Sequence, residues 1–309
     1  MSTVAVIMAT YNGEKYLREQ IESILNSSYQ DFELFIYDDG STDNTLKLIS
    51  EYEKLYPSKI HIHQNEKNLG VCINFLRAVS MTTMDYIMLC DQDDVWKPDK
   101  IAKTLKRMKN MESRFGKNLP LAVFTDADIV DENLNIINKS FFGYNHLNPS
   151  KTDLAHILME NKLIGCTVMI NSSVRKLLHN YPLPVNAKFH DWWIALITSS
   201  MGKIGYINER TLYYRQHSSN IVGGSGFYSY VKNRLSNFGK QKEALISLYR
   251  QADEFLNIYS PILSPDSKKL ISDFAHLGEM GFIKRRLLIL KKGYLKTGLI
   301  RNLGLMIIA

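Results

Sequence analysis

Residues 4–43 read VAVIMATYNGEKYLREQIESILNSSYQDFELFIYDDGSTD, and this stretch decides the fold. It begins with residues 4–9, an apolar run typical of a buried strand. Residues 14–26 then carry apolar side chains at the period of a helix, and residues 32–37 form a second strand-like run. A strand, a helix and a strand in this order predict a βαβ unit with parallel strands.

The same alternation continues further along the chain. Residues 60–63 and 86–89 are two more predicted strands. From Leu121 onward the predicted strands are shorter, at 122–125 and 167–170, with helices at 174–180 and 191–200. We therefore predict an α/β fold with a mainly parallel central sheet, which binds its ligands at the carboxyl ends of the strands.

The composition changes after Gly223 and Gly224, where long helical stretches begin. One of them carries an apolar stripe made of Leu245, Leu248, Tyr249, Ala252, Phe255 and Tyr259. We divide the chain into a catalytic domain, residues 1–224, and a helical C-terminal region, residues 225–309.

The net charge of +7 is concentrated near the end of the chain. Seven basic residues and no acidic ones follow position 283, so the basicity favours a partner met at this tail, and we expect no nucleic-acid partner. The tail mixes Lys and Arg with Leu and Ile, which indicates a helix lying on an anionic membrane surface. Gly293, Gly298 and Gly304 interrupt its apolar stripe, so a docking helix for a homo-oligomer is the alternative.

Three cysteines without CxxC spacing suggest neither disulfides nor a structural zinc site. The first residues lack the basic leader and cleavage site of a signal peptide. We expect a cytoplasmic protein, peripheral on the inner face of the membrane.

Acidic pairs follow two of the predicted strands. Asp38 and Asp39 precede Gly40, where they either contact a nucleoside or form an Asx turn. Asp91 and Asp93 end the apolar run 86–90 and share one face of an extended backbone. Two aligned carboxylates suit Mg²⁺ or Mn²⁺, and a solvated acidic turn is the alternative.

Four motifs together resemble family 2 glycosyltransferases of the GT-A fold, over about residues 1–220. They are Thr10-Tyr11-Asn12, residues 38–43, Asn68-Leu69-Gly70 and Asp91-Gln92-Asp93-Asp94. The resemblance implies a nucleotide diphosphate sugar as donor, and a metal, Mn²⁺ or Mg²⁺, bound by Asp93. It implies a donor pocket lined by Thr10, Tyr11, Asn12, Asp39, Asn68, Gly70, Asp91 and Gln92.

His190-Asp191-Trp192-Trp193 matches the position where this family keeps its catalytic base. Asp191 would take a proton from the acceptor hydroxyl, and the helix dipole would keep its carboxylate ionised. The alternative is a helix cap with a buried Trp pair. Because adjacent residues point to different faces, one Trp is expected in the core and the other beside the sugar.

Two further sets complete the predicted site. Tyr214-Arg215-Gln216-His217 resembles the family's late histidine motif, which implies that His217 joins the metal and favours Mn²⁺, with a phosphate or structural role for Arg215. Asp128, His190 and Trp192 are predicted to face the acceptor, although turn chemistry explains Asp126 and Asp128 equally well.

Among relatives, these motifs are most similar to bacterial rhamnosyltransferases of cell-wall polysaccharide. This implies an inverting enzyme with dTDP-L-rhamnose as donor and a lipid-linked glycan as acceptor. A UDP-hexose-dependent enzyme of the same family is the first alternative. A nucleotidyltransferase, or a non-catalytic scaffold that binds nucleotide sugars, is a weaker one, because the first loop lacks the basic residues of a nucleotidyltransferase.

Overall fold

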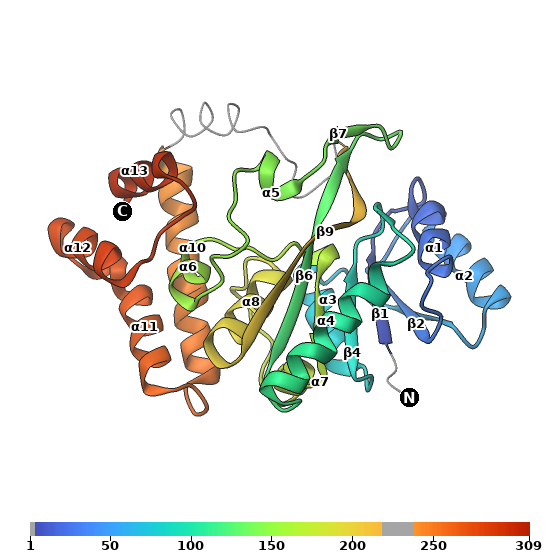
Figure 1. Ribbon diagram of the computed structural model, residues 1–309, viewed down its shortest axis with the longest axis horizontal. Helices are drawn as coiled ribbons and strands as arrows, with labels where there is room; N and C mark the ends of the chain where they lie inside the picture. The colour runs from blue at the N-terminus through green and yellow to red at the C-terminus, as the bar shows by residue number, and fades with distance from the viewer. Residues whose placement is uncertain (1–3, 218–237) are drawn as a thin grey trace.

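The structure is a computed structural model that describes residues 4–217 and 238–309. Within those residues nine strands form one sheet, in the order β3-β2-β1-β4-β8-β6-β9-β5, with β7 paired to β6 (Figure 1). The strands are β1 (Val4–Thr10), β2 (Phe32–Asp38), β3 (Ile60–Gln64), β4 (Tyr86–Cys90), β5 (Val95–Trp96), β6 (Leu121–Val130), β7 (Ile136–Asn138), β8 (Met169–Asn171) and β9 (Lys203–Arg215).

Parallel pairing brings the carboxyl ends of three strands together. β1 lies between β2 and β4 and is parallel to both. In register, Thr10 pairs with Asp38, and Met8 pairs with Cys90. The residues that follow these strands therefore meet at one edge of the sheet, as the α/β prediction required. β8 runs antiparallel to β4 and β6, which makes the sheet mixed.

Helices cover both faces of the sheet, and β1 shows why. Its side chains alternate between two hydrophobic clusters: Ala5 and Ile7 belong to one, and Val6 and Met8 to the other. α1 (Leu17–Leu25), α2 (Thr45–Leu55) and α4 (Lys100–Phe115) pack in the second cluster, whereas α3 (Val71–Met81), α7 (Ser172–Asn180) and α8 (His190–Met201) pack in the first. The predicted α/β class is confirmed.

Local boundaries differ from prediction near residue 167. The strand expected at 167–170 is displaced to β8, and Gly165–Thr167 forms a 3₁₀ turn. Here Thr167 Oγ1 donates to the Ile164 carbonyl at 2.8 Å, and the Val168 amide donates to the Gly165 carbonyl at 3.0 Å. These local hydrogen bonds compete with extension of the strand.

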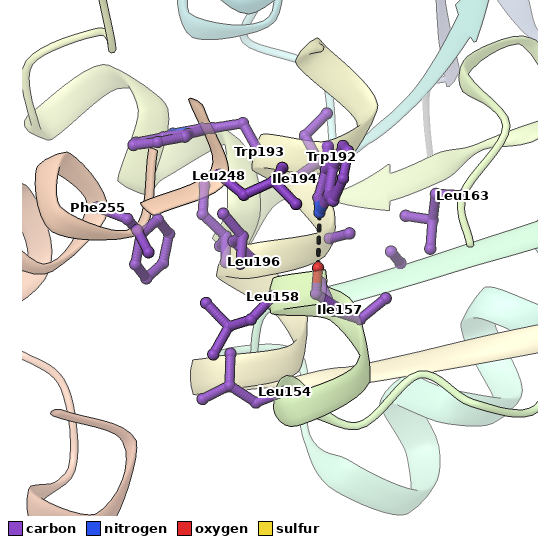
Figure 2. Close-up of a cluster of buried hydrophobic side chains, with 14 of the residues drawn as sticks. Leu154, Ile157, Leu158, Leu163, Trp192, Trp193, Ile194, Leu196, Leu248 and Phe255 are labelled. Carbon is purple, nitrogen blue, oxygen red and sulfur yellow. Dashed lines mark hydrogen bonds between the residues drawn. The ribbon is translucent and has the colours of Figure 1, made fainter. Parts of the chain in front are cut away.

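The C-terminal helices pack beside α8 at the end of the molecule away from the N-terminus (Figure 1). They are α10 (Phe238–Tyr259), α11 (Pro265–Ala275), α12 (Phe282–Lys292) and α13 (Leu299–Ile308), and two short helices, α5 (Phe141–Tyr144) and α6 (Leu154–Met159), precede α7. The predicted stripe of α10 is buried, from Leu245 to Tyr259. Figure 2 shows Leu248 and Phe255 of α10 near Trp193 of α8, all within one hydrophobic cluster.

The predicted boundary between residues 224 and 225 lies outside the residues that the structure describes. On the described parts of the chain, no helix combines the length and the apolarity needed to cross a bilayer.

Replacing Phe255 with alanine is expected to lower the free energy of unfolding by about 3–5 kcal/mol. The Phe255 ring is fully buried and meets the ring of Trp193 edge-on, at 5.1 Å between centroids. Urea unfolding measures the loss. Phe282→Ala is the matched control, because that ring is 68% exposed, and its effect is expected to stay within about 0.5 kcal/mol. A loss from Phe255→Ala as small as that from Phe282→Ala would show that the α8–α10 contact adds nothing to stability.

Candidate active site

A cavity of about 1090 Å³ opens at the carboxyl ends of β1, β2 and β4. Thirteen of the fifteen predicted site residues line it. They are Thr10, Tyr11, Asn12, Asp39, Asn68, Gly70, Asp91, Gln92, Asp93, His190, Asp191, Trp192 and His217. Residues that lie up to 207 positions apart in the chain thus share one cavity, because the sheet brings their strands together.

The two carboxylates after β2 have separate tasks. Asp38 is fully buried and accepts hydrogen bonds from the Gly40 and Ser41 amides and from Thr10 Oγ1, so it forms the Asx turn. Asp39 lines the cavity and accepts from the Leu69 and Gly70 amides, each at 2.8 Å. Asp38 therefore forms the Asx turn, and a nucleoside contact by Asp39 stays a prediction. Asp39 also fixes the loop that carries Asn68 and Gly70 to the cavity wall.

Gln92 binds the first loop rather than open space. Its Oε1 accepts from the Tyr11 amide at 2.9 Å, and its Nε2 donates to the Tyr11 carbonyl at 3.1 Å. A Cβ on Gly13 would lie 2.2 Å from Gln92 Oε1, so a side chain at this position would displace the Gln92 amide from Tyr11. The structure thus gives Gln92 a positioning role: it holds Tyr11 and Asn12 at the mouth of the cavity.

The acidic loop meets the late histidine. His217 Nε2 lies 2.8 Å from Asp93 Oδ2, and the His217 ring stacks on Tyr16 at 4.8 Å between centroids. Loss of hydration, followed by the charges of Asp93 and Asp191, raises the pKa of Asp91 to about 7. Several carboxyl groups therefore crowd one region, and a cation would stabilise their ionised forms.

A carboxylate oxygen beside an imidazole nitrogen is a donor set that suits Mn²⁺. Asp93 and His217 therefore fit the predicted metal, and both line the cavity. Ligand atoms of Asp91, Asp94 and Cys166 also lie within 4.8 Å of one another. Burial raises the pKa of the Asp94 carboxyl and of the Cys166 thiol well above their ordinary values, which favours their protonated forms over metal ligation.

Asp191 sits in the first turn of α8, at the cavity wall. Its Oδ2 accepts from the Gly165 amide at 3.0 Å, while its Oδ1 is buried without a hydrogen-bond partner among the described residues. Burial raises the pKa of Asp191 to about 7, against the weaker opposing effect of the amides of Trp192 and Gly165. The helix dipole was expected to keep this group ionised, but desolvation outweighs the dipole and brings the pKa of Asp191 close to neutral pH.

His190 is held neutral beside Asp191. Its ring stacks on Phe75 at 4.1 Å between centroids, and burial lowers its pKa to about 3. Both ring nitrogens are buried without partners among the described residues. A Cβ on Gly165 would lie 2.7 Å from His190 Nε2, so Gly165 lets His190 and Asp191 approach its backbone. Gly165 was not among the predicted site residues, because in the sequence it is only a glycine after two apolar residues.

The two tryptophans have different surroundings, and a sugar contact by Trp192 stays a prediction. Trp193 is fully buried against α10 (Figure 2). Trp192 lines the cavity, and its Nε1 donates to the Ile157 carbonyl at 2.6 Å, the dashed line in Figure 2.

Two predicted residues do not join the cavity lining. Arg215 is buried, where its Nε donates to the Asp93 carbonyl at 2.8 Å and its guanidinium pairs with Glu19. It organises the acidic loop, which favours the structural role that the sequence left open beside a phosphate contact. Asp128 pairs with Lys97 at 2.5 Å and with Arg210 at 3.2 Å, and it is not among the residues that line the cavity.

Comparison with known proteins gives matches in sequence and in fold. Residues 5–115 match the family model described as Glycosyl transferase family 2. The chain is 30% identical over 247 residues to dTDP-rhamnosyl transferase RfbG of Shigella flexneri, a match that covers 74% of this chain and 78% of that protein. It is 31% identical over 218 residues to the uncharacterized glycosyltransferase MJ1057 of Methanocaldococcus jannaschii, covering 69% and 70%.

Solved structures show the same fold. S. aureus TarS 1-349 in complex with UDP-GlcNAc superposes with a TM-score of 0.56 at 19% identity, covering 90% of this chain and 73% of that one. Mannosyltransferase PcManGT from Pyrobaculum calidifontis, in complex with GDP-Man and Mn²⁺, gives a TM-score of 0.55 at 16% identity, covering 94% and 72%. At these identities the likeness concerns the fold alone.

Proposed function

Because the chain belongs to glycosyltransferase family 2 and has the GT-A fold, we propose that it transfers L-rhamnose from dTDP-L-rhamnose, with inversion, to a lipid-linked glycan. Transfer of a sugar from a nucleotide sugar is the activity of this family. The observation that carries the proposal is one cavity lined by Asp93, His217 and Asp191. A leaving-group site and a carboxylate base thereby share the same space.

Asp93 and His217 would hold the metal, Mn²⁺ in preference to Mg²⁺. When bound, the ion supplies positive charge for the departing nucleoside diphosphate. The loops held by Asp39 and Gln92 form the donor end of the cavity, with Asn68, Gly70 and Tyr11 exposed to it. Their preset positions reduce the ordering that donor binding requires.

Asp191 acts as the general base. The Gly165 amide fixes Oδ2, so that Oδ1 remains to accept the proton of an acceptor hydroxyl. As this proton moves, the hydroxyl oxygen attacks the anomeric carbon, and the bond from that carbon to the diphosphate oxygen breaks. Attack opposite the leaving group inverts the configuration. The neutral imidazole of His190 can hydrogen-bond a sugar hydroxyl beside the base.

The pH dependence of kcat/KM follows from the pKa of Asp191. A base works only when deprotonated, so we expect kcat/KM to fall about tenfold per pH unit below pH 7 and to level off above it. The profile is measured from initial rates at roughly two pH units on either side of that pKa, between about pH 5 and pH 9. A profile that is flat down to pH 5, roughly two units below the pKa of Asp191, would contradict a base of this pKa.

The choice of donor is supported by the similarity to a protein named dTDP-rhamnosyl transferase. Turnover of dTDP-L-rhamnose, UDP-glucose and UDP-N-acetylglucosamine, each with and without Mn²⁺, tests it. We expect dTDP-L-rhamnose to be consumed fastest, and only with the metal. Preferential turnover of a UDP-sugar would support the alternative, a UDP-hexose-dependent enzyme.

The proposed acceptor also implies where in the cell the enzyme acts. A lipid-linked glycan is met at the membrane, so we place the enzyme on the inner face of the cell membrane as a peripheral protein. A homo-oligomer formed through the C-terminal helices remains the alternative use of the tail. Residues 1–224 would carry the catalysis, and residues 225–309 would supply the docking.

A further inference from the structure

Apolar side chains are concentrated on the outer faces of α12 and α13. On α12, Ile283, Leu287 and Leu290 recur at helical spacing and are 58–71% exposed. On α13, the corresponding exposed residues are Leu299, Ile300, Leu303 and Ile307. The opposite faces are buried through Ile289 and Leu305. Exposed apolar rows of this kind are typical of helices that interact with a partner or a membrane.

α12 is strongly basic, whereas the one basic residue of α13, Arg301, is buried. Lys284 and Lys291 are exposed on α12, next to the apolar row. No acidic residue follows Glu279 in the chain, whereas seven basic residues do. An apolar row flanked by lysines complements a surface with an apolar interior and a negatively charged rim.

This charge pattern argues against a second copy of the chain as the occupant. A twofold interface would place each surface patch against its own copy. The lysines of α12 would then face lysines, with no acidic side chain from either helix to balance them. An anionic bilayer offers both the opposite charge and the apolar interior.

The inner face of α13 belongs to the cavity. Arg301 lines it and pairs with Glu160 at 3.2 Å, and Lys296, just before α13, lines it as well. Arg286 Nε on α12 donates to the Met306 carbonyl on α13 at 2.7 Å, which ties the two helices together. They lie at the end of the molecule away from the N-terminus (Figure 1). A surface bound to the outer faces would therefore sit close to one end of the cavity.

We propose that the outer faces of α12 and α13 dock the protein on an anionic lipid bilayer and so present the Arg301 end of the cavity to acceptors in that bilayer. The first half of this proposal stands on the exposed residues alone. The second half rests on the proposed function.

Sedimentation of the full chain with lipid vesicles tests the docking. We expect binding to vesicles of equal parts phosphatidylglycerol and phosphatidylcholine, and much weaker binding to pure phosphatidylcholine. Leu287→Ser is expected to weaken binding at least about tenfold, because one leucine side chain fewer enters the apolar interior of the bilayer on docking. Lys284→Gln with Lys291→Gln is expected to weaken it about 30-fold, from two lost attractions to the lipid charge.

The matched controls change exposed residues outside α12 and α13. Leu55→Ser removes a leucine that is 70% exposed on α2, and Lys106→Gln with Lys109→Gln removes two exposed lysines from α4. Both controls are expected to bind vesicles as the unaltered protein does. All these side chains are exposed, so each variant should keep the unaltered melting temperature, which circular dichroism checks.

Donor hydrolysis without vesicles is measured for every variant, and it separates this proposal from the proposed function. Unchanged hydrolysis together with lost vesicle binding is the expected result for the α12 variants. Absence of vesicle binding by the unaltered protein would overturn the proposal, as would binding that the α12 changes leave intact. A dimer that Leu287→Ser dissociates, with no vesicle binding, would assign the surface to a second copy instead.

Discussion

Replacing Asp191 with asparagine is expected to lower kcat by about 10²–10⁴-fold while leaving donor affinity unchanged. Asparagine has the same shape and still offers an oxygen to the Gly165 amide, so the wall of the cavity is retained. It cannot take a proton, so the acceptor hydroxyl loses its base. Transfer rates, together with calorimetric binding of the donor, measure the two effects separately.

Asp266→Asn is the control for this experiment. Asp266 also occupies the first turn of a helix, α11, but it is exposed and does not line the cavity. Its change should leave kcat unaltered. If Asp191→Asn kept full turnover, Asp191 would be only a helix cap, which was the alternative that the sequence left open.

Replacing Asp93 with asparagine is expected to reduce kcat by about 10²-fold or more at a fixed Mn²⁺ concentration. The amide removes the negative oxygen that lies 2.8 Å from His217 Nε2, so metal affinity should fall. A titration with Mn²⁺ should then show activity partly restored at high metal concentration. This rescue distinguishes a metal ligand from a residue that only supports the fold.

Asp85→Asn serves as the matched control, because Asp85 is an exposed carboxylate just before β4, at the strand end opposite to the acidic loop. Its Mn²⁺ dependence should equal that of the unaltered enzyme. An Asp93→Asn enzyme with unchanged Mn²⁺ dependence would place the metal elsewhere, with Asp91, Asp94 and Cys166 as the next set to examine.

The placement of the donor end followed from local sequence. Thr10, Asp39 and Asp91 come directly after short apolar runs, and parallel strands bring their carboxyl ends to one edge of the sheet. The spacing of apolar residues, and the order of strands and helices along the chain, can be read from short segments of sequence. For this reason the α/β class and most of the cavity lining could be predicted without coordinates.

Long-range packing decided what the sequence could not supply. The pKa of Asp191 depends on burial against the Gly165 turn, which is 26 residues away, and no local pattern reports that burial. Arg215 carries a side chain suited to phosphate, but Glu19 and the Asp93 carbonyl, which hold it, lie far away in the chain. Asp128 likewise depends on Lys97 and Arg210. Such partners become visible only in the folded chain.

The outward direction of the tail also required the structure. Sequence showed the basic residues and the broken apolar stripe, and it left a membrane and another subunit as alternatives. The structure separates the inner residues Ile289, Arg301 and Leu305 from the exposed row on α12 and α13. The glycines at 293 and 298 have positive φ values of 74° and 85° and form the connection between these two helices. Two of the three glycines that interrupt the stripe thus form the turn between two amphipathic helices, and the third, Gly304, lies within α13.

In the proposed reaction, the bond between the sugar and the diphosphate breaks in this cavity. The most direct test is the identity of the nucleotide released from dTDP-L-rhamnose in the presence of Mn²⁺, separated by ion-exchange chromatography. We predict dTDP as the nucleotide product, formed by the unaltered enzyme and lost in Asp191→Asn. Release of dTMP, or formation of dTTP when pyrophosphate is added, would show cleavage at phosphorus and would contradict glycosyl transfer.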